Sequence, residues 1–133
     1  MDDAVNNKFA TYPDEARAAL LDIRGGIFEL ADEHGLVIEE TLKWGQLSYL
    51  TKTGSTIRID HSSQHPDQIK IFFNCKTRLV ETFKEIYGDL FDYESNRVVM
   101  LKISAQFPKD ELRRCLLTAL KYHQLKQLPL LGF

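Results

Sequence analysis

The sequence lacks most features that would place a protein in a specialised class. It has only two cysteines, Cys75 and Cys115, so no disulfide framework is expected. No apolar run reaches the roughly 20 residues that a membrane-spanning helix needs. The first residues are acidic and lack the basic, then apolar pattern of a secretory signal. These absences favour a cytoplasmic protein with no membrane partner.

Positive charge is not in excess either. The 17 Lys and Arg residues are outnumbered by 19 Asp and Glu residues, which gives a formal net charge of −2. Such a balance argues against a dedicated nucleic-acid-binding protein. The charge is unevenly distributed, because residues 1–40 hold ten acids and three bases whereas residues 41–133 hold nine acids and fourteen bases. The acidic first part is the most unusual feature of the composition.

Familiar catalytic and cofactor-binding motifs are also absent. The chain has no phosphate-binding loop, no G-x-G-x-x-G, no H-E-x-x-H, no C-x-x-C and no G-x-S-x-G. Distant residues can still assemble a catalytic site, so this absence lowers the odds of an enzyme without excluding one. The length of 133 residues, with 44% of them hydrophobic, fits one globular domain over residues 1–133 with no linker or repeat.

The period of the hydrophobic residues changes along the chain. Apolar residues recur with a helical period from Pro13 to His34, and Gly35 is a typical stop signal. Alternating residues then predict short strands up to Asn74. We predict an α+β fold, with an antiparallel sheet of about five or six strands and long N- and C-terminal helices packed on one of its faces. The later elements are expected at 76–87 (helix), 91–93 and 97–103 (strands), and from about 108 (helix).

Two adjacent glycines interrupt the first predicted helix. Gly25 and Gly26 each cost about 1 kcal/mol of helix stability relative to alanine. We therefore expect either close backbone packing or a local bend at this point.

Acidic residues follow one face of the same helix. At 100° per residue, Asp22, Glu29 and Glu33 project in similar directions, away from the apolar stripe. This face is either a solvated surface or a weak site for a divalent cation or a basic partner. His61 and His65, which lie near Asp60 and Asp67, form a second candidate for a metal site, although polar loops often contain such residues.

A third candidate lies between the first two predicted strands. Lys43, Trp44, Gly45 and Tyr49 combine an indole ring, a permissive glycine and a tyrosine with a polar tip, and together form a candidate ligand or partner surface. Alternatively, Trp44 and Tyr49 close the end of the core. In either case we expect Trp44 to be at least half buried. Bases at alternating strand positions are expected on the open sheet face, where a solvated surface is the simpler interpretation: Lys43, Arg58, Lys70 and Lys102.

These residues resemble a known family. Pro13-Asp14-Glu15 at a helix start, Lys43-Trp44-Gly45 with Tyr49, and Lys121-Tyr122 at the end of the last helix are similar to the YdhG-like bacterial domain family of largely unknown function. Leu47 stands where the family usually has proline. The resemblance implies a frataxin-like fold and, through a relative regarded as an iron chaperone, possible iron binding. The residues that match by position are Asp22, Glu29 and Glu33 on the helix, with Glu39 and Glu40 on the first strand.

Three hypotheses of function follow. The first is a non-catalytic binding module that handles iron through its acidic helix. The second is an interaction domain that meets a protein partner through the surface from Trp44 to Tyr49. The third is an enzyme of unknown type, for which no nucleophile and base are visible in the sequence.

Overall fold

The computed structural model describes residues 1–133 and has an α+β fold with one antiparallel sheet of six strands. The strands lie in the order β1-β2-β3-β4-β6-β5, which confirms the predicted fold class. The strands are β1 (Glu39–Lys43), β2 (Gln46–Leu50), β3 (Ile57–His61), β4 (Gln68–Phe72), β5 (Asp92–Glu94) and β6 (Val98–Lys102). The helices are α1 (Asp3–Ala10), α2 (Asp14–Glu33), α3 (Leu79–Tyr87), α4 (Lys109–Leu120) and α5 (Tyr122–Leu125), with short 3-10 turns η1 (Gly88–Leu90) and η2 (Pro129–Gly132).

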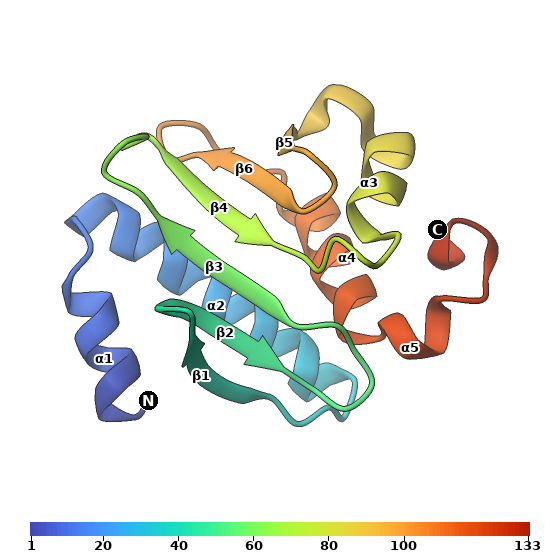
Figure 1. The fold of residues 1–133 in the computed structure, drawn as a ribbon, viewed down its shortest axis with the longest axis horizontal. Helices are drawn as coiled ribbons and strands as arrows, with labels where there is room; N and C mark the ends of the chain where they lie inside the picture. Colours follow the sequence, from blue (N-terminus) through green and yellow to red (C-terminus); the bar gives the residue numbers. More distant parts are fainter.

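Helices α2 and α4 lie behind the sheet, on the same side of it (Figure 1). The apolar stripe of α2 supplies the buried residues Leu20 and Ile27. Alternate strand residues face them, because successive side chains of a strand point to opposite faces. Together they form one core cluster that includes Leu47, Ile59 and Ile71. None of the helices is long and apolar enough to cross a membrane.

Helix α1 was not expected from the sequence. The Asp2 carboxylate accepts a hydrogen bond of 2.9 Å from the backbone N–H of Val5 and so caps the helix. Only Val5 and Phe9 of this helix are buried. Two buried residues in a helix of eight make a weak periodic signal, so the sequence alone does not predict this helix.

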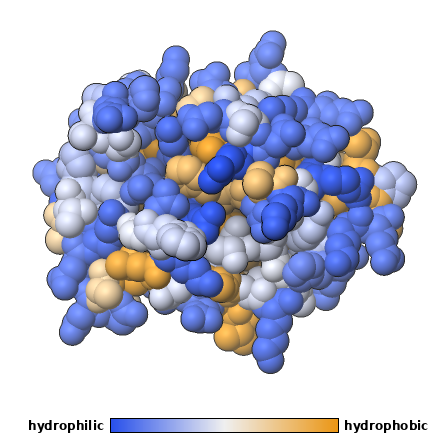
Figure 2. Space-filling view, viewed as in Figure 1, coloured by the Kyte–Doolittle hydropathy of each residue, from blue (hydrophilic) through white to orange (hydrophobic).

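The face of the sheet turned away from α2 and α4 carries polar and apolar side chains together. Strand register places Ser48, Arg58, Phe72, Val98 and Glu94 in one row across five strands. Figure 2, which looks onto this face, shows hydrophilic residues with small apolar patches between them. The open face is therefore not a continuous apolar surface.

The two glycines of α2 do not mark close packing. A Cβ atom added to Gly25 would meet nothing within 4 Å, and one added to Gly26 would meet only Nη1 of Arg113, at 3.9 Å. Close backbone packing, the first of the two expected explanations, is therefore wrong, and a local bend stays a prediction. The glycines instead border an open groove between α2 and α4.

Candidate functional site

A tight hairpin joins β1 to β2 and carries the only tryptophan of the chain. Lys43 pairs with Gln46, which leaves Trp44 and Gly45 as a two-residue turn. Trp44 is 89% exposed, so the expectation that it would be at least half buried is wrong. Ile38, Leu42 and Trp44 stand at even positions, so a strand continuing through them would turn Trp44 inward, but β1 ends at Lys43 and the turn begins there.

The backbone of Trp44 is strained. Its φ is +56° and that of Gly45 is +74°. Two-residue hairpins with positive φ at both central positions favour Asn-Gly, and a bulky residue with positive φ is an outlier. Residues held in such regions cost on the order of 1–3 kcal/mol each. Trp44 therefore occupies a position where asparagine or glycine would be more stable, and its ring makes little contact that offsets the strain.

Tyr49 points to the face of the sheet that packs against α2. It is fully buried and its ring packs edge-on against Phe28, at 6.1 Å between centroids. Burial raises the pKa of Tyr49, and the nearby Glu40 carboxylate raises it further. Glu40 itself is bound by Arg24, with 2.5 Å between Nε and Oε2. Of the four predicted surface residues, Lys43, Trp44 and Gly45 stay together at the hairpin, whereas Tyr49 belongs to the core.

A hollow of about 250 Å³ lies beside the hairpin and is here called the hairpin pocket. Lys43 and Arg58 project onto the open face, because they alternate with the inward residues Leu42 and Ile57. The first residues after β4 and the one before β6 complete the wall. The full lining is Lys43, Trp44, Thr56, Arg58, Phe73, Asn74, Cys75 and Arg97.

The hairpin pocket contains three bases and no acid. None of the ion pairs of the structure includes Lys43, Arg58 or Arg97. Arg58 is partly buried, and its Nε is a buried donor to which no protein group offers an acceptor. An unsatisfied buried donor costs roughly 1–3 kcal/mol, and more when the group is charged. The pocket thus has positive charge and hydrogen-bond donors that the protein itself does not neutralise.

Alternation along the strands predicts Lys43 and Arg58 on the open face, but the sequence does not indicate that Arg97, Asn74 and Thr56 line the same pocket. Arg97 reaches the pocket because its carbonyl accepts a 2.7 Å hydrogen bond from the N–H of Phe73, which extends the β4–β6 pairing. That pairing joins segments distant in sequence. The residues next to Arg97 in the sequence therefore do not indicate that it lies beside the hairpin.

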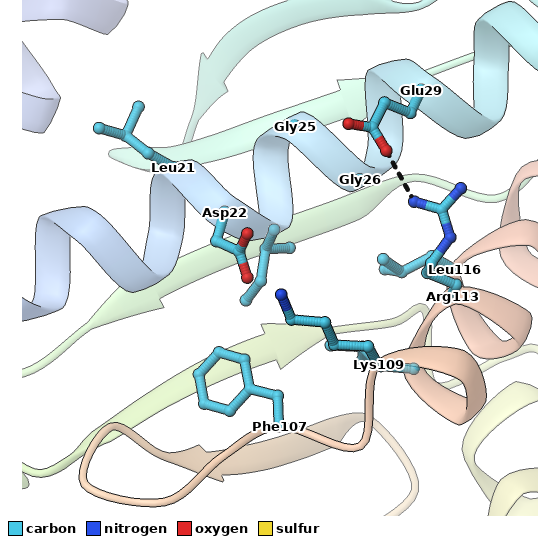
Figure 3. A pocket seen from close by; sticks show the side chains of 11 residues that line it. Leu21, Asp22, Gly25, Gly26, Glu29, Phe107, Lys109, Arg113 and Leu116 are labelled. Atoms are coloured by element: carbon cyan, nitrogen blue, oxygen red, sulfur yellow. Dashed lines mark hydrogen bonds and ion pairs between the residues drawn. The ribbon is translucent and has the colours of Figure 1, made fainter.

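The second charged region is the groove between α2 and α4 (Figure 3). Asp22 and Glu29 line it from α2, and Lys109 and Arg113 line it from α4. Nη1 of Arg113 lies 3.0 Å from the Glu29 carboxylate. Figure 3 shows Lys109 extending toward Asp22 across the groove. Acids and bases therefore face each other in this region.

The predicted metal residues do not form a metal centre. Arg113 also contacts Glu33, at 3.3 Å from Nη2 to Oε1, so one guanidinium binds both Glu29 and Glu33. No group of three or more His, Cys, Asp or Glu side chains is placed to hold a metal ion. Asp22, Glu29 and Glu33 are exposed, as expected, but this arrangement does not fit a tight iron site. Weak iron binding there stays a prediction.

The residues of the other candidate metal loop have separate partners. Nε2 of His61 lies 2.9 Å from the carbonyl oxygen of Pro66. Asp60 accepts a 2.6 Å hydrogen bond from the Tyr12 hydroxyl, and Asp67 accepts one of 2.8 Å from the Ser104 hydroxyl. His65 is exposed. These contacts anchor the loop and do not gather ligands around one point.

The fold and the hairpin pocket together describe an α+β domain with a positively charged hollow on its open sheet face. No protein-family model, no curated protein and no solved structure matches the chain. The resemblance to the YdhG-like family therefore stays a prediction.

Proposed function

We propose that this protein is a non-catalytic binding module that binds an anionic ligand in the hairpin pocket. The observation that carries the proposal is the set of three bases, Lys43, Arg58 and Arg97, around one hollow with no acid in its lining. Charged donors form stronger hydrogen bonds with anions than neutral donors do. The buried Nε of Arg58, which no protein acceptor satisfies, supplies such a donor.

The exposure of Trp44 also favours the hairpin pocket as the binding surface. Backbone strain that packing does not explain is typical of functional positions. The ring is available to a ligand or to a protein partner, since 89% of the residue is exposed. A protein partner is therefore the second candidate. Its contact surface would comprise Lys43, Trp44 and Gly45, without the buried Tyr49.

Tryptophan fluorescence can test the proposal directly, because Trp44 is the only tryptophan and lines the pocket. Sodium phosphate should cause a saturable change in emission that sodium chloride at the same ionic strength does not cause. Arg58→Gln should weaken the response at least about tenfold, since a hydrogen bond to a charged group contributes roughly 1.5–3 kcal/mol.

Lys102→Gln is the matched control, because it removes one positive charge from β6 at a residue that does not line the pocket. The control should respond like the wild type. A wild-type protein without a saturable response, or an Arg58→Gln variant that responds equally, would overturn the proposal.

A further inference from the structure

We infer that the anion is a nucleoside phosphate, with its phosphate in the hairpin pocket and its base stacked on Trp44. This inference rests on the proposed function, because it identifies the class of ligand for the same pocket. It uses a feature that anion binding alone does not need, namely the exposed indole ring at the edge of a cationic hollow.

The size of the pocket indicates a ligand that extends beyond it. Its volume of about 250 Å³ is below the roughly 300–1,000 Å³ of most small-molecule sites. A phosphate group fits among the three bases, and the remainder of a larger ligand would lie outside. Trp44 lines this pocket while staying 89% exposed, so its ring extends the site into solvent.

Stacking gives Trp44 a role that explains its strained turn. An aromatic side chain that stacks on a nucleobase contributes roughly 1–3 kcal/mol per base. This gain is comparable to the cost of about 1–3 kcal/mol for an unfavourable backbone conformation.

The open face favours a single nucleotide over a nucleic-acid strand. Beyond the hairpin pocket, the same face carries Asp60 opposite Lys70 and Asp92 opposite Met100. Lys70 is already paired with Glu94, at 3.1 Å. A strand needs a continuous positive track for successive phosphates, and these acids interrupt it. The net charge of −2 agrees with this restriction.

Calorimetric titration with three matched probes tests the inference. Adenosine 5′-monophosphate has both groups, ribose 5-phosphate lacks the base, and adenosine lacks the phosphate. The wild type should bind the monophosphate at least about fivefold more tightly than ribose 5-phosphate, and adenosine should show no measurable binding. In Trp44→Asn the monophosphate and ribose 5-phosphate should bind equally, because the ring is gone and the bases remain. Trp44→Gly, which also suits a positive φ, should repeat this result.

The outcomes separate the two levels of the proposal. Equal affinity of the wild type for the monophosphate and ribose 5-phosphate would overturn the stacking inference and leave the anion site intact. Absence of binding by every phosphate probe would overturn both. An oligoadenylate that binds more than about tenfold more tightly than the monophosphate would replace the single nucleotide with a strand.

Discussion

The hairpin pocket and the α2–α4 groove are both charged, but their charges are arranged in opposite ways. In the groove, Arg113 lies within hydrogen-bond distance of Glu29 and Glu33. In the pocket, Lys43, Arg58 and Arg97 have no acidic partner. A charge already paired on the protein surface has less to gain from a ligand, because binding must first break the existing contact.

This difference shows why composition misdirects the search for a site. The excess of acids in residues 1–40 is visible in the sequence, yet two of the most prominent acids are paired with a base from α4. The basic pocket is invisible in the net charge of −2. Local pairing, which depends on the fold, decides which charges remain available.

Substitutions at Tyr49 in the core and Trp44 in the hairpin turn should have the largest effects on stability, with opposite signs. Tyr49→Ala should lower the free energy of unfolding by about 3–5 kcal/mol, as for other large aromatic residues in a core. Trp44→Asn should raise it by about 1 kcal/mol, because asparagine suits a positive φ. Urea denaturation followed by circular dichroism measures both. A loss of several kcal/mol in Trp44→Asn would mean that the ring supports the core.

Charge reversal should distinguish the pocket from the groove. Arg97→Glu places a carboxylate at the pocket and should weaken phosphate binding by roughly a hundredfold, since an attraction becomes a repulsion at close range. Arg113→Glu makes the same change in the groove and should leave phosphate affinity within about twofold. Both affinities can be measured by calorimetry. Similar losses in the two variants would indicate a general effect of surface charge.

A smaller effect is expected at the glycines of the groove. Gly25→Ala should stabilise the protein by about 1 kcal/mol, because alanine favours a helix and its methyl group meets no neighbour here. The same variant should leave phosphate binding unchanged, because Gly25 lines the α2–α4 groove and not the hairpin pocket. Thermal unfolding gives the first quantity. A destabilised variant would contradict the open space assigned to this position.

Iron binding at the acidic helix should be weak. Arg113 competes with any cation for Glu29 and Glu33. The Arg113→Gln variant should therefore bind ferrous iron a few-fold more tightly than the wild type. A triple variant that removes the carboxylates should bind iron more weakly than the wild type: Asp22→Asn, Glu29→Gln and Glu33→Gln. Anaerobic titration measures all three proteins. No detectable binding by the wild type would end the iron-chaperone hypothesis for this chain, and equal binding by the triple variant would place the site elsewhere.

The smallest expected effect is a loss of stability at alkaline pH. Burial raises the pKa of Tyr93 from its ordinary 10.0 to about 12. The folded state therefore holds the Tyr93 proton at pH values where the unfolded state releases it. This proton makes its full contribution to the free energy of unfolding below pH 10, and the contribution declines as the pH rises toward 12. The melting temperature of the wild type should fall relative to that of Tyr93→Phe over this range, because phenylalanine has no hydroxyl group to ionise. A constant difference would exclude Tyr93 as the cause.

Regular elements were predictable from the sequence because burial imposes a period on them. The helix expected from Pro13 to His34 is observed as Asp14–Glu33, and the expected strand from Thr56 to Asp60 as Ile57–His61. The orientation of Trp44 was not predictable in this way. It depends on a two-residue turn in which Trp44 stands where such turns usually have asparagine.

The candidate site was predictable only in part. Lys43, Trp44 and Gly45 are neighbours in sequence and were expected to act together. Arg97 joins them only through the pairing of β4 with β6, and the loss of Glu29 and Glu33 as free acids depends on the packing of α4 against α2. Contacts between distant segments determine both results.

A single NMR titration compares the two charged regions most directly. The side-chain Nε–Hε resonances of Arg58 and Arg113 can be followed in one spectrum of ¹⁵N-labelled protein while sodium phosphate is added at constant ionic strength, with Arg58→Lys and Arg113→Lys to assign them. The Arg58 resonance should shift and saturate, because its unpaired Nε gains an acceptor, and the Arg113 resonance should stay in place. An Arg58 resonance that does not move, or equal unsaturated shifts of both resonances, would contradict an anion site in the hairpin pocket.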